Sequence, residues 1–426
     1  MKKLNATTAY LIRCVISALC SGLIFTALSA YYVRNVGMNP LQLVLVGTAI
    51  ETTCFLFEVP TGIVADMYSR RLSVIIGGFL IGICYLLTGL VPVFLAIIVA
   101  EIIRGIGETF ISGAADAWIT DEVGSDQIGH VFLRGSQASQ VGGLLGVLLS
   151  VGLASWFDYK TPILLGGALW IGLSLLSILI MPETAFTPTP RGERTHIQSM
   201  VHTLGEGLHL VRRTPVLIVL LLGEILYGAF SEGFDRLWEA HFLTNLNMPV
   251  LSLPVIGKLD PIAWFGVFSV ILTITGLISA EIVRRRVNLN DHNTVARTLV
   301  VFYAFVMAGV IGLGLAHNFG WAVIAFLVAN QFRGLAGPVI STWLNQNINS
   351  NVRATVLSLN SQSNALGQIA GGPGVGALGK TYGIRAALTL SGVLLLPLLA
   401  LYARTINRHA PVMAETEEVV LPQTHP

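Results

Sequence analysis

Three ionisable side chains lie on one face of an apolar segment near residues 95–118. Glu101, Arg104 and Glu108 are three and four residues apart, a spacing that places them on the same side of an α-helix. The Arg104 guanidinium can pair with one carboxylate, which leaves the other without a counterion. Because an uncompensated carboxylate in a low-dielectric environment can bind and release a proton near neutral pH, this pattern predicts proton coupling at Glu108. A static ion pair that braces the helix is the alternative.

A second pair of carboxylates lies on the apolar segment 41–64. Glu51 and Glu58 are seven residues apart, so they share one face of a helix. Glu51 falls near the middle of the segment and is a second candidate for proton coupling. Glu58 precedes Pro60, where a helix kinks, and it fits a gating or bracing role better.

A third candidate, Glu224, falls halfway along the segment 215–240, with Tyr227 three residues later. The end of this segment carries a run of charged residues. Glu232 and Arg236 are four residues apart there, which suits an ion pair on one helix face. We expect a structural network of ion pairs at this end, with an extracellular gate as the alternative.

These charges interrupt a chain that is otherwise strongly apolar. Only 11% of the 426 residues are charged, against about 25% in soluble domains. A helix needs about 20 apolar residues to cross the hydrocarbon core of a membrane, and twelve segments qualify. They lie near residues 9–33, 41–64, 72–93, 95–118, 131–155, 161–181, 215–240, 261–283, 298–317, 320–344, 355–379 and 384–404. The sequence therefore predicts an all-α integral membrane protein with twelve transmembrane helices.

The basic residues indicate the orientation in the membrane. Sixteen lysines and arginines fall on one side of the twelve segments and five on the other, and the richer side is the cytoplasmic one. Both termini are therefore expected in the cytoplasm, and the short loops favour a bacterial inner membrane. The longest polar stretch, 182–213, suits a cytoplasmic linker. It would join six-helix bundles at 1–181 and 214–405, with a cytoplasmic tail over 406–426.

The two halves resemble each other in sequence. Residues 100–105 read AEIIRG and residues 329–334 read ANQFRG, so that Arg104 and Arg333 occupy equivalent positions 229 residues apart. Duplicated halves around a site in the membrane midplane are the expected architecture of a secondary transporter.

The loop after the second segment carries a motif of glycine, aspartate and two arginines. The motif reads G-x-x-x-D-x-x-x-R-R and consists of Gly62, Asp66, Arg70 and Arg71. Together with the twelve segments and the duplicated halves, it resembles the signature loop of the major facilitator superfamily of secondary transporters. The resemblance implies two pseudo-symmetric bundles that alternate in access. It also implies a loop that latches the outward-facing state through contacts at the eleventh helix, with Gly62 permitting a close helix approach.

The resemblance further implies which residues face the substrate. In this family the first, fourth, seventh and tenth helices line a central cavity, and an arginine on the fourth helix tunes a coupling carboxylate. The proton-coupling residues predicted here are Glu108, Glu51, Glu224 and Arg104. The substrate-cavity residues predicted here are Arg104, Glu108, Glu224, Tyr227, Asn330, Gln331 and Arg333. Arg333 is either an anchor for an anion or only the structural counterpart of Arg104.

Two functions remain open at this point. Acidic residues in an apolar cavity suit lipophilic cations, which favours a proton-coupled exporter of amphipathic organic compounds, similar to the drug:proton antiporters. The antiporter motif of the fifth helix matches poorly, however: residues 140–146 have its glycines without its proline, and a glycine–proline segment occurs at 371–374 instead. The alternative is a proton symporter that imports a small polar or anionic nutrient, held by Arg104 and Arg333.

Other classes of function are disfavoured. The chain has no phosphate-binding G-x-x-x-x-G-K-[ST] loop and no H-E-x-x-H or G-x-S-x-G motif, so neither an ATP-driven pump nor an enzyme is expected. The net charge of +2 does not suit nucleic-acid binding. The four cysteines lack metal-ligand spacing, and no metal or cofactor is expected. The expected partners are a small-molecule substrate, protons and the lipid bilayer around a monomer.

Overall fold

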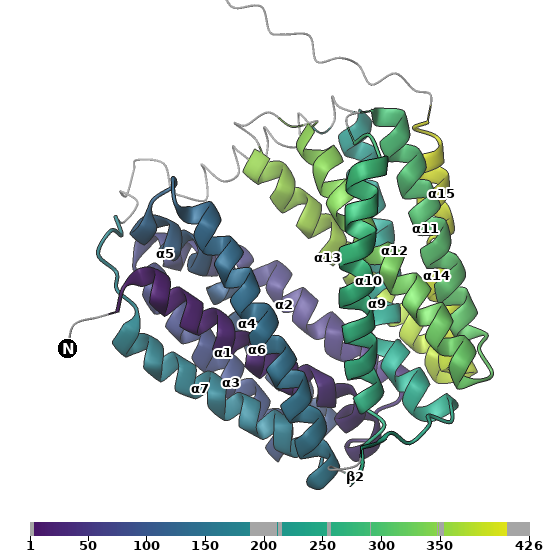
Figure 1. Ribbon diagram of the computed structural model, residues 1–426, viewed down its shortest axis with the longest axis horizontal. Helices are drawn as coiled ribbons and strands as arrows, with labels where there is room; N and C mark the ends of the chain where they lie inside the picture. Colours follow the sequence, from purple (N-terminus) through teal and green to yellow (C-terminus); the bar gives the residue numbers. More distant parts are fainter. Residues whose placement is uncertain are drawn as a thin grey trace, which may run out of the picture.

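The chain folds into two bundles of helices (Figure 1). The structure is a computed structural model, and it describes residues 4–187, 211, 215–253, 257–289, 291–346, 348 and 353–406. Most of the predicted linker 182–213 and the tail from residue 407 onward lie outside these residues.

The first bundle contains α1 (Ala6–Ala30), the π-helix η1 (Tyr31–Asn35), α2 (Pro40–Met67), α3 (Arg70–Leu90), α4 (Phe94–Ile111), α5 (Ala114–Val123), α6 (Ile128–Trp156) and α7 (Lys160–Ile180). The second contains α9 (Pro215–Asn245), α10 (Ala263–Arg286), α11 (His292–Gly314), α12 (Phe319–Gln346), α13 (Arg353–Tyr382), α14 (Ile384–Val393) and α15 (Leu396–Ala403). Between α9 and α10, β1 (Ser252–Leu253) and β2 (Gly257–Lys258) form a short antiparallel pair.

Twelve segments of the described chain cross the membrane, as the sequence predicts. Ten are long and apolar enough on their own, with η1 continuing α1 and with α14 and α15 forming one span. The other two are α4, with three charged residues in 18, and α13, which is rich in glycine, serine and asparagine. Polar groups at membrane depth need protein around them, and both helices pack against neighbours, α4 on α2 and α3, and α13 on α2 and α9. The all-α membrane fold is therefore confirmed.

Local sequence signals fix several helix ends. α2 begins with a capping box, in which the Asn39 side chain accepts from Gln42 N and the Asn39 N–H donates to the Gln42 side chain. The side chain of Ser69 caps α3 by accepting from Leu72 N at 2.9 Å. These caps fall in the short loops between spans, where the sequence changes from apolar to polar.

Two predicted spans are broken, contrary to the sequence prediction. The segment predicted at 95–118 ends at Ile111, and a separate helix, α5, begins at Ala114. Gly113 between them has a φ of 68°, a left-handed conformation that glycine adopts readily. The last span breaks between α14 and α15, where Pro397 in the first turn of α15 cannot continue the hydrogen bonding of the preceding helix.

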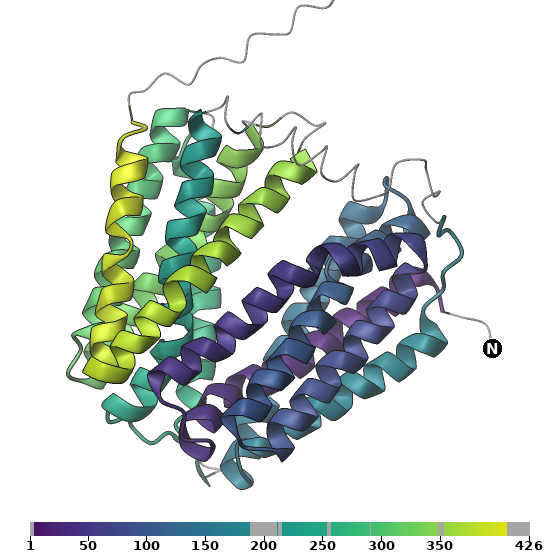
Figure 2. The same cartoon turned by 180° about the vertical axis from the view of Figure 1, so that it is seen from behind.

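The two bundles touch at one end and diverge toward the other, as Figure 1 and Figure 2 show. At the closed end the beginning of α2 packs on glycines near the end of α13. A Cβ atom added at Gly376 would lie 3.0 Å from Val44 Cβ, and one at Gly379 would lie 2.8 Å from Pro40 Cβ. The open end is the one at which α1 and α13 begin. With the orientation that the basic residues predict, the cleft opens to the cytoplasm.

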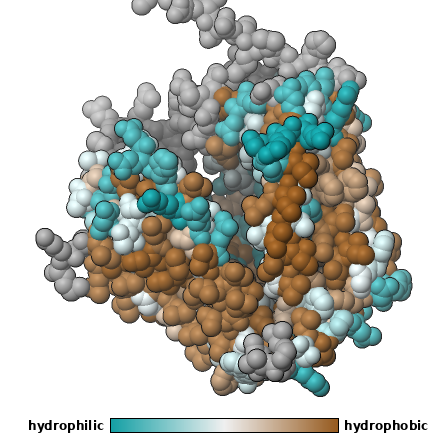
Figure 3. All heavy atoms as spheres, in the orientation of Figure 1, coloured by the Kyte–Doolittle hydropathy of each residue, from teal (hydrophilic) through white to brown (hydrophobic). Residues whose placement is uncertain are grey.

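Hydropathy follows this geometry. Figure 3 shows apolar residues around the sides of both bundles and hydrophilic residues at the open end and inside the hollow between the bundles. Lipid-facing helices carry large exposed side chains such as Leu148 on α6 and Leu277 on α10. The polar cleft, rather than the outer wall, is therefore the place to look for a site.

Candidate functional site

The fourth span holds a buried ion pair. Arg104 Nε donates to Glu101 Oε2 at 2.6 Å, and the Tyr32 hydroxyl donates to the other oxygen of Glu101 at 3.1 Å. The guanidinium also lies over the rings of Phe25 and Tyr85. The ion pair expected within this helix is therefore present, and Arg104 is committed to Glu101.

Because Arg104 pairs with Glu101, Glu108 is left without a counterion on this helix. It is half-buried on α4 and within range of the Arg104 charge. Among the described residues it forms no ion pair. Its predicted role in proton coupling stays a prediction.

Glu51 occupies the junction of the two bundles. It lines a cavity of about 430 Å³ between α2 and α13, which also exposes Ser361 and Gln362 of the second bundle. Its carboxylate is attracted by Arg104 on one side and by Arg236 of α9 on the other, but forms no ion pair with either. Sequence reasoning did not connect Glu51 with Arg236, because the two residues come from different halves of the chain.

A second cavity, of about 300 Å³, lies inside the second bundle. Glu224 lines it and accepts a hydrogen bond from Asn364 Nδ2 at 2.8 Å, and Asn360 lies beside the same carboxylate. The aromatic rings of Tyr227 and Tyr303 form part of the wall. Glu224 thus has neutral donors around it and, among the described residues, no cationic partner.

Arg333 lines the same cavity but is already paired. Its Nη2 lies 2.7 Å from Asp235 Oδ2, its Nη1 pairs with the other oxygen of Asp235, and its Nε donates to the Tyr227 hydroxyl. The rings of Phe230 and Phe234 lie against its guanidinium. Sequence reasoning placed Asp235 only in the charged run of the seventh span and missed this pairing.

The closed end of the cleft contains the ion pair expected within α9. Arg236 Nε lies 3.2 Å from Glu232 Oε1, and the Glu232 side chain is only 1% exposed. Both side chains press on α2 at Gly47, where an added Cβ would lie 1.9 Å from Glu232 Oε1. The pair therefore forms part of the seal between the bundles, beside Glu239, which lines a small cavity there with Ser29.

Two predicted cavity residues point elsewhere. Gln331 Oε1 accepts from Thr275 of α10 at 2.6 Å, and Asn330 Nδ2 donates to the Phe326 carbonyl of its own helix at 3.0 Å. Neither lines the cavities that contain Glu51 or Glu224. The structure thus brings Glu224, Tyr227 and Arg333 together around one cavity, whereas Asn330, Gln331, Arg104 and Glu108 line neither of these two cavities.

The signature loop is bound within its own bundle. Arg70 pairs with Asp121 of α5 and lies 3.4 Å from Asp66, whose side chain is 54% exposed. The Arg71 backbone N–H donates to Glu183 at 2.9 Å. The partners of Arg70 and Arg71 lie on α2, α5 and α7 and in the residues just after α7; none of them, among the described residues, belongs to the second bundle.

Gly62 does not support the close helix approach expected there, because an added Cβ would meet no atom within 4 Å. The cleft is open at this end, so the neighbour that would approach is absent. The predicted latch to the eleventh helix is therefore not closed in this conformation.

The chain is similar to known membrane proteins over nearly its whole length. Residues 11–372 match the family model of the Major Facilitator Superfamily. An uncharacterized MFS-type transporter of Bacillus subtilis (strain 168), YxaM, is 24% identical over 384 residues, which cover 89% of this chain and 91% of that protein.

Solved structures of low sequence identity share the fold. A bacterial homolog of the human lysosomal transporter Spinster, in an inward-facing and unoccupied conformation, has a TM-score of 0.70 at 15% identity, covering 96% of this chain and 98% of the other. A POT family transporter in complex with 5-aminolevulinic acid has a TM-score of 0.70 at 12% identity, with 94% and 96% covered. The nucleoside transporter NupG has a TM-score of 0.68 at 13% identity, with 95% and 100% covered.

Proposed function

The chain belongs to the major facilitator superfamily, and from this premise we propose that it is a proton-coupled exporter of amphipathic organic cations. As a member it is a multi-pass membrane transporter with an alternating-access fold, and not an enzyme. The proposal concerns what the chain adds to this family fold: the substrate class, the coupling ion and the direction.

One observation carries the proposal: the arginines of the cleft are paired, whereas three of its carboxylates are not. Arg104 is held by Glu101, and Arg333 by Asp235. Among the described residues, Glu51, Glu108 and Glu224 form no ion pair. A cation entering the cleft therefore finds uncompensated negative charge. An anion would have to displace a carboxylate from one of these guanidinium groups, and at the buried Arg104–Glu101 pair breaking the pair costs about 3–5 kcal/mol.

The walls of the second cavity suit the body of such a cation. The rings of Tyr227 and Tyr303 pack edge to face in the wall beside Glu224, and the Arg333 guanidinium lies over the Tyr227 ring. Aromatic faces attract organic cations by about 0.5–2 kcal/mol, depending on desolvation. A substrate with an ammonium group and an apolar or aromatic body would therefore satisfy both features of this cavity.

Glu51 is the carboxylate best placed to couple protonation to the conformational change. In its charged form it attracts Arg236 of the opposite bundle across the cleft. Protonation would remove this attraction and weaken the closed end, which favours the opposite conformation. The bundles would then rock about the cleft, and the signature loop would latch the state in which the cytoplasmic end is closed. Glu108 and Glu224 are the other two candidates for the carboxylate that binds the coupled proton.

Import of a small polar or anionic compound with protons is the second candidate. Arg333 favours it, since its guanidinium lines the cavity beside Tyr227 and Asn360. A ligand carboxylate could replace Asp235, which is 41% exposed. The two candidates therefore predict opposite consequences of removing the Arg333 charge.

Proton movement in proteoliposomes distinguishes the candidates. The purified protein would be tested under an imposed pH gradient with a panel of lipophilic cations and small organic anions, using a pH-sensitive dye inside the vesicles. Cation-triggered proton flux that disappears in Glu51→Gln or Glu108→Gln supports the exporter. Flux triggered only by anions, and lost in Arg333→Ala, supports the importer. Glu281→Gln is the matched control, because Glu281 pairs with Arg284 at the end of α10, outside the cavities.

A further inference from the structure

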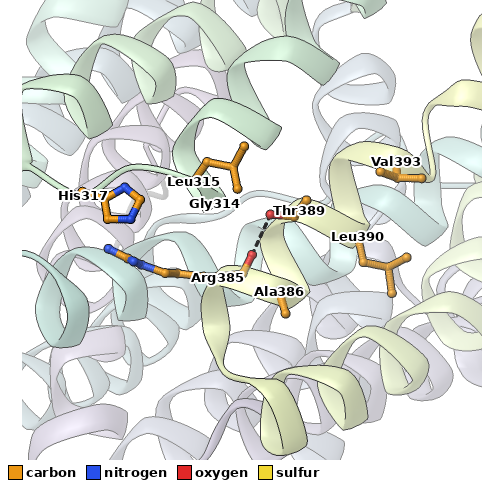
Figure 4. A pocket seen from close by; sticks show the side chains of 8 residues that line it. All are labelled: Gly314, Leu315, His317, Arg385, Ala386, Thr389, Leu390 and Val393. Atoms are coloured by element: carbon orange, nitrogen blue, oxygen red, sulfur yellow. Dashed lines mark hydrogen bonds between the residues drawn. The ribbon is translucent and has the colours of Figure 1, made fainter.

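A cavity of about 500 Å³ lies away from the cleft. It is a groove between the end of α11, with the loop that follows it, and the length of α14 (Figure 4). Small residues form its floor: Gly314, Ala386 and Thr389. A Cβ atom added at Gly314 would lie 2.6 Å from Thr389 Oγ1, so the two helices approach each other closely at this point.

The groove is polar at one end and apolar at the other. Figure 4 shows Arg385 and His317 at one end and Leu390 and Val393 at the other. Arg385 and Val393 are eight residues apart on one helix, so the polar and apolar ends are separated by about 12 Å along the helix axis. Val393 is 39% exposed, and nearby Leu315 is 57% exposed. The gradient runs from the membrane boundary toward the hydrocarbon core.

The polar end has positive charge that is not neutralised. One Nη of Arg385 donates to the Ala316 carbonyl at 2.8 Å, and a guanidinium has further N–H donors. None of the residues lining the groove is acidic, and Arg385 forms no ion pair among the described residues. Two exposed aromatic residues at the same end of the bundle, Tyr382 and Trp321, mark the level of the lipid headgroups.

We propose that this groove binds one anionic phospholipid of the membrane leaflet opposite the termini. The headgroup phosphate would contact Arg385 and His317, and one acyl chain would lie along Leu390 and Val393. Charge complementarity commits the site to an anionic lipid, because a zwitterionic headgroup leaves the Arg385 guanidinium without net compensation. A soluble anion would use only the polar end and would leave the apolar half of the groove uncovered. The site is separate from the transport cleft and does not depend on the proposed substrate.

Lipid binding to the purified full-length protein tests this assignment. Native mass spectrometry of delipidated protein would be titrated with dioleoyl phosphatidylglycerol or dioleoyl phosphatidylcholine. We expect preferential retention of phosphatidylglycerol by the wild type. At about 1 kcal/mol per arginine near the lipid surface, which is about fivefold, Arg385→Gln should reduce the preference about fivefold, and the double variant with His317→Asn should reduce it at least as much. Lys380→Gln, which removes an exposed charge at the same end of the bundle, is the matched control.

A second variant separates a lipid from a free anion. Val393→Trp should fill the apolar half of the groove and reduce retention of phosphatidylglycerol without changing the charge. Glycerophosphoglycerol, the headgroup alone, should bind far more weakly than the lipid. Equal retention of the two lipids would overturn the proposal, as would a loss in Lys380→Gln that equals the loss in Arg385→Gln. Tight binding of the headgroup alone, with no effect of Val393→Trp, would also overturn it. Each variant would first be checked for a single monodisperse peak in the same detergent.

Discussion

A methyl group at Gly47 should open the closed end of the cleft. Gly47 lies on α2 where the ion pair of α9 presses against it. In Gly47→Ala the new Cβ would lie 1.9 Å from Glu232 Oε1 and 2.1 Å from Arg236 Nε. Ordinary contact begins near 3.4 Å, so the carboxylate oxygen must retreat by about 1.5 Å. Because the Glu232 side chain is 1% exposed, it has little free space into which to move, and the bundles must separate or the ion pair must distort.

The expected size of the effect follows from this overlap. An extra methyl group in a well-packed interface costs typically about 1–3 kcal/mol. This cost falls only on the conformation in which α2 and α9 touch. Since each 1.4 kcal/mol is a factor of ten, the equilibrium should shift about 5- to 150-fold away from the conformation described here. At the upper end of this range a state that starts at about ten to one would become the minor one, whereas a fivefold shift would leave it the major one with a clearly larger opposite population.

Distance measurements between spin labels would detect the shift. Labels at Lys160→Cys and Lys380→Cys, on exposed positions at the closed ends of the two bundles, would report their separation by double electron–electron resonance. The four native cysteines would be replaced beforehand. Gly172→Ala is the matched control, because an added Cβ there meets no atom within 4 Å. A distance distribution in Gly47→Ala that matches the distribution in Gly172→Ala would refute the reasoning.

Three further predictions follow from individual contacts. Asn39→Ala removes the capping box of α2 and should cost about 1 kcal/mol, which corresponds to a fall in Tm of about 2 °C in detergent; an unchanged Tm would contradict the assigned cap. Partial desolvation acts to raise the pKa of Asp158, but hydrogen bonds from Thr161 outweigh it and hold this pKa below its ordinary value. The resulting stabilisation is fully present at neutral pH and is lost as the pH falls through the lowered pKa of the folded protein. Asp158→Asn should therefore lower the Tm more at pH 7 than at about pH 2. Removing the positive charge in Arg333→Gln should increase the affinity for a lipophilic cation severalfold in equilibrium binding, whereas the importer would lose its anion.

The sequence alone predicts the fold because the membrane restricts what the chain can do. Apolar segments of about 20 residues must be helices, and their number, together with the repeat around Arg104 and Arg333, predicts the two bundles. The exceptions have local causes. Gly113 takes a left-handed conformation and ends α4 early, which no hydrophobic pattern indicates. α13 crosses the membrane with a polar composition because its neighbours α2 and α9 cover it.

The site is less accessible to sequence reasoning because its partners come from distant parts of the chain. Glu101 and Arg104 are three residues apart, and their pairing was predictable. Arg333 pairs with Asp235 across 98 residues, and Glu224 binds Asn364 across 140. Which carboxylates remain unpaired is therefore a property of the assembled bundles. This property, which no single segment reveals, carries the proposal that the substrate is a cation.

Comparing two modes of transport in Glu51→Gln would test the central claim most directly. One mode is uptake of a lipophilic cation, such as tetraphenylphosphonium, into proteoliposomes whose interior is more acidic than the medium, so that outward proton flow drives the uptake. The other is exchange of labelled for unlabelled cation with no gradient. We predict that Glu51→Gln abolishes the gradient-driven uptake and retains the exchange, because the variant keeps the cavity but has no carboxylate to protonate. Full gradient-driven uptake in Glu51→Gln, with the same proton flux as the wild type, would contradict the account.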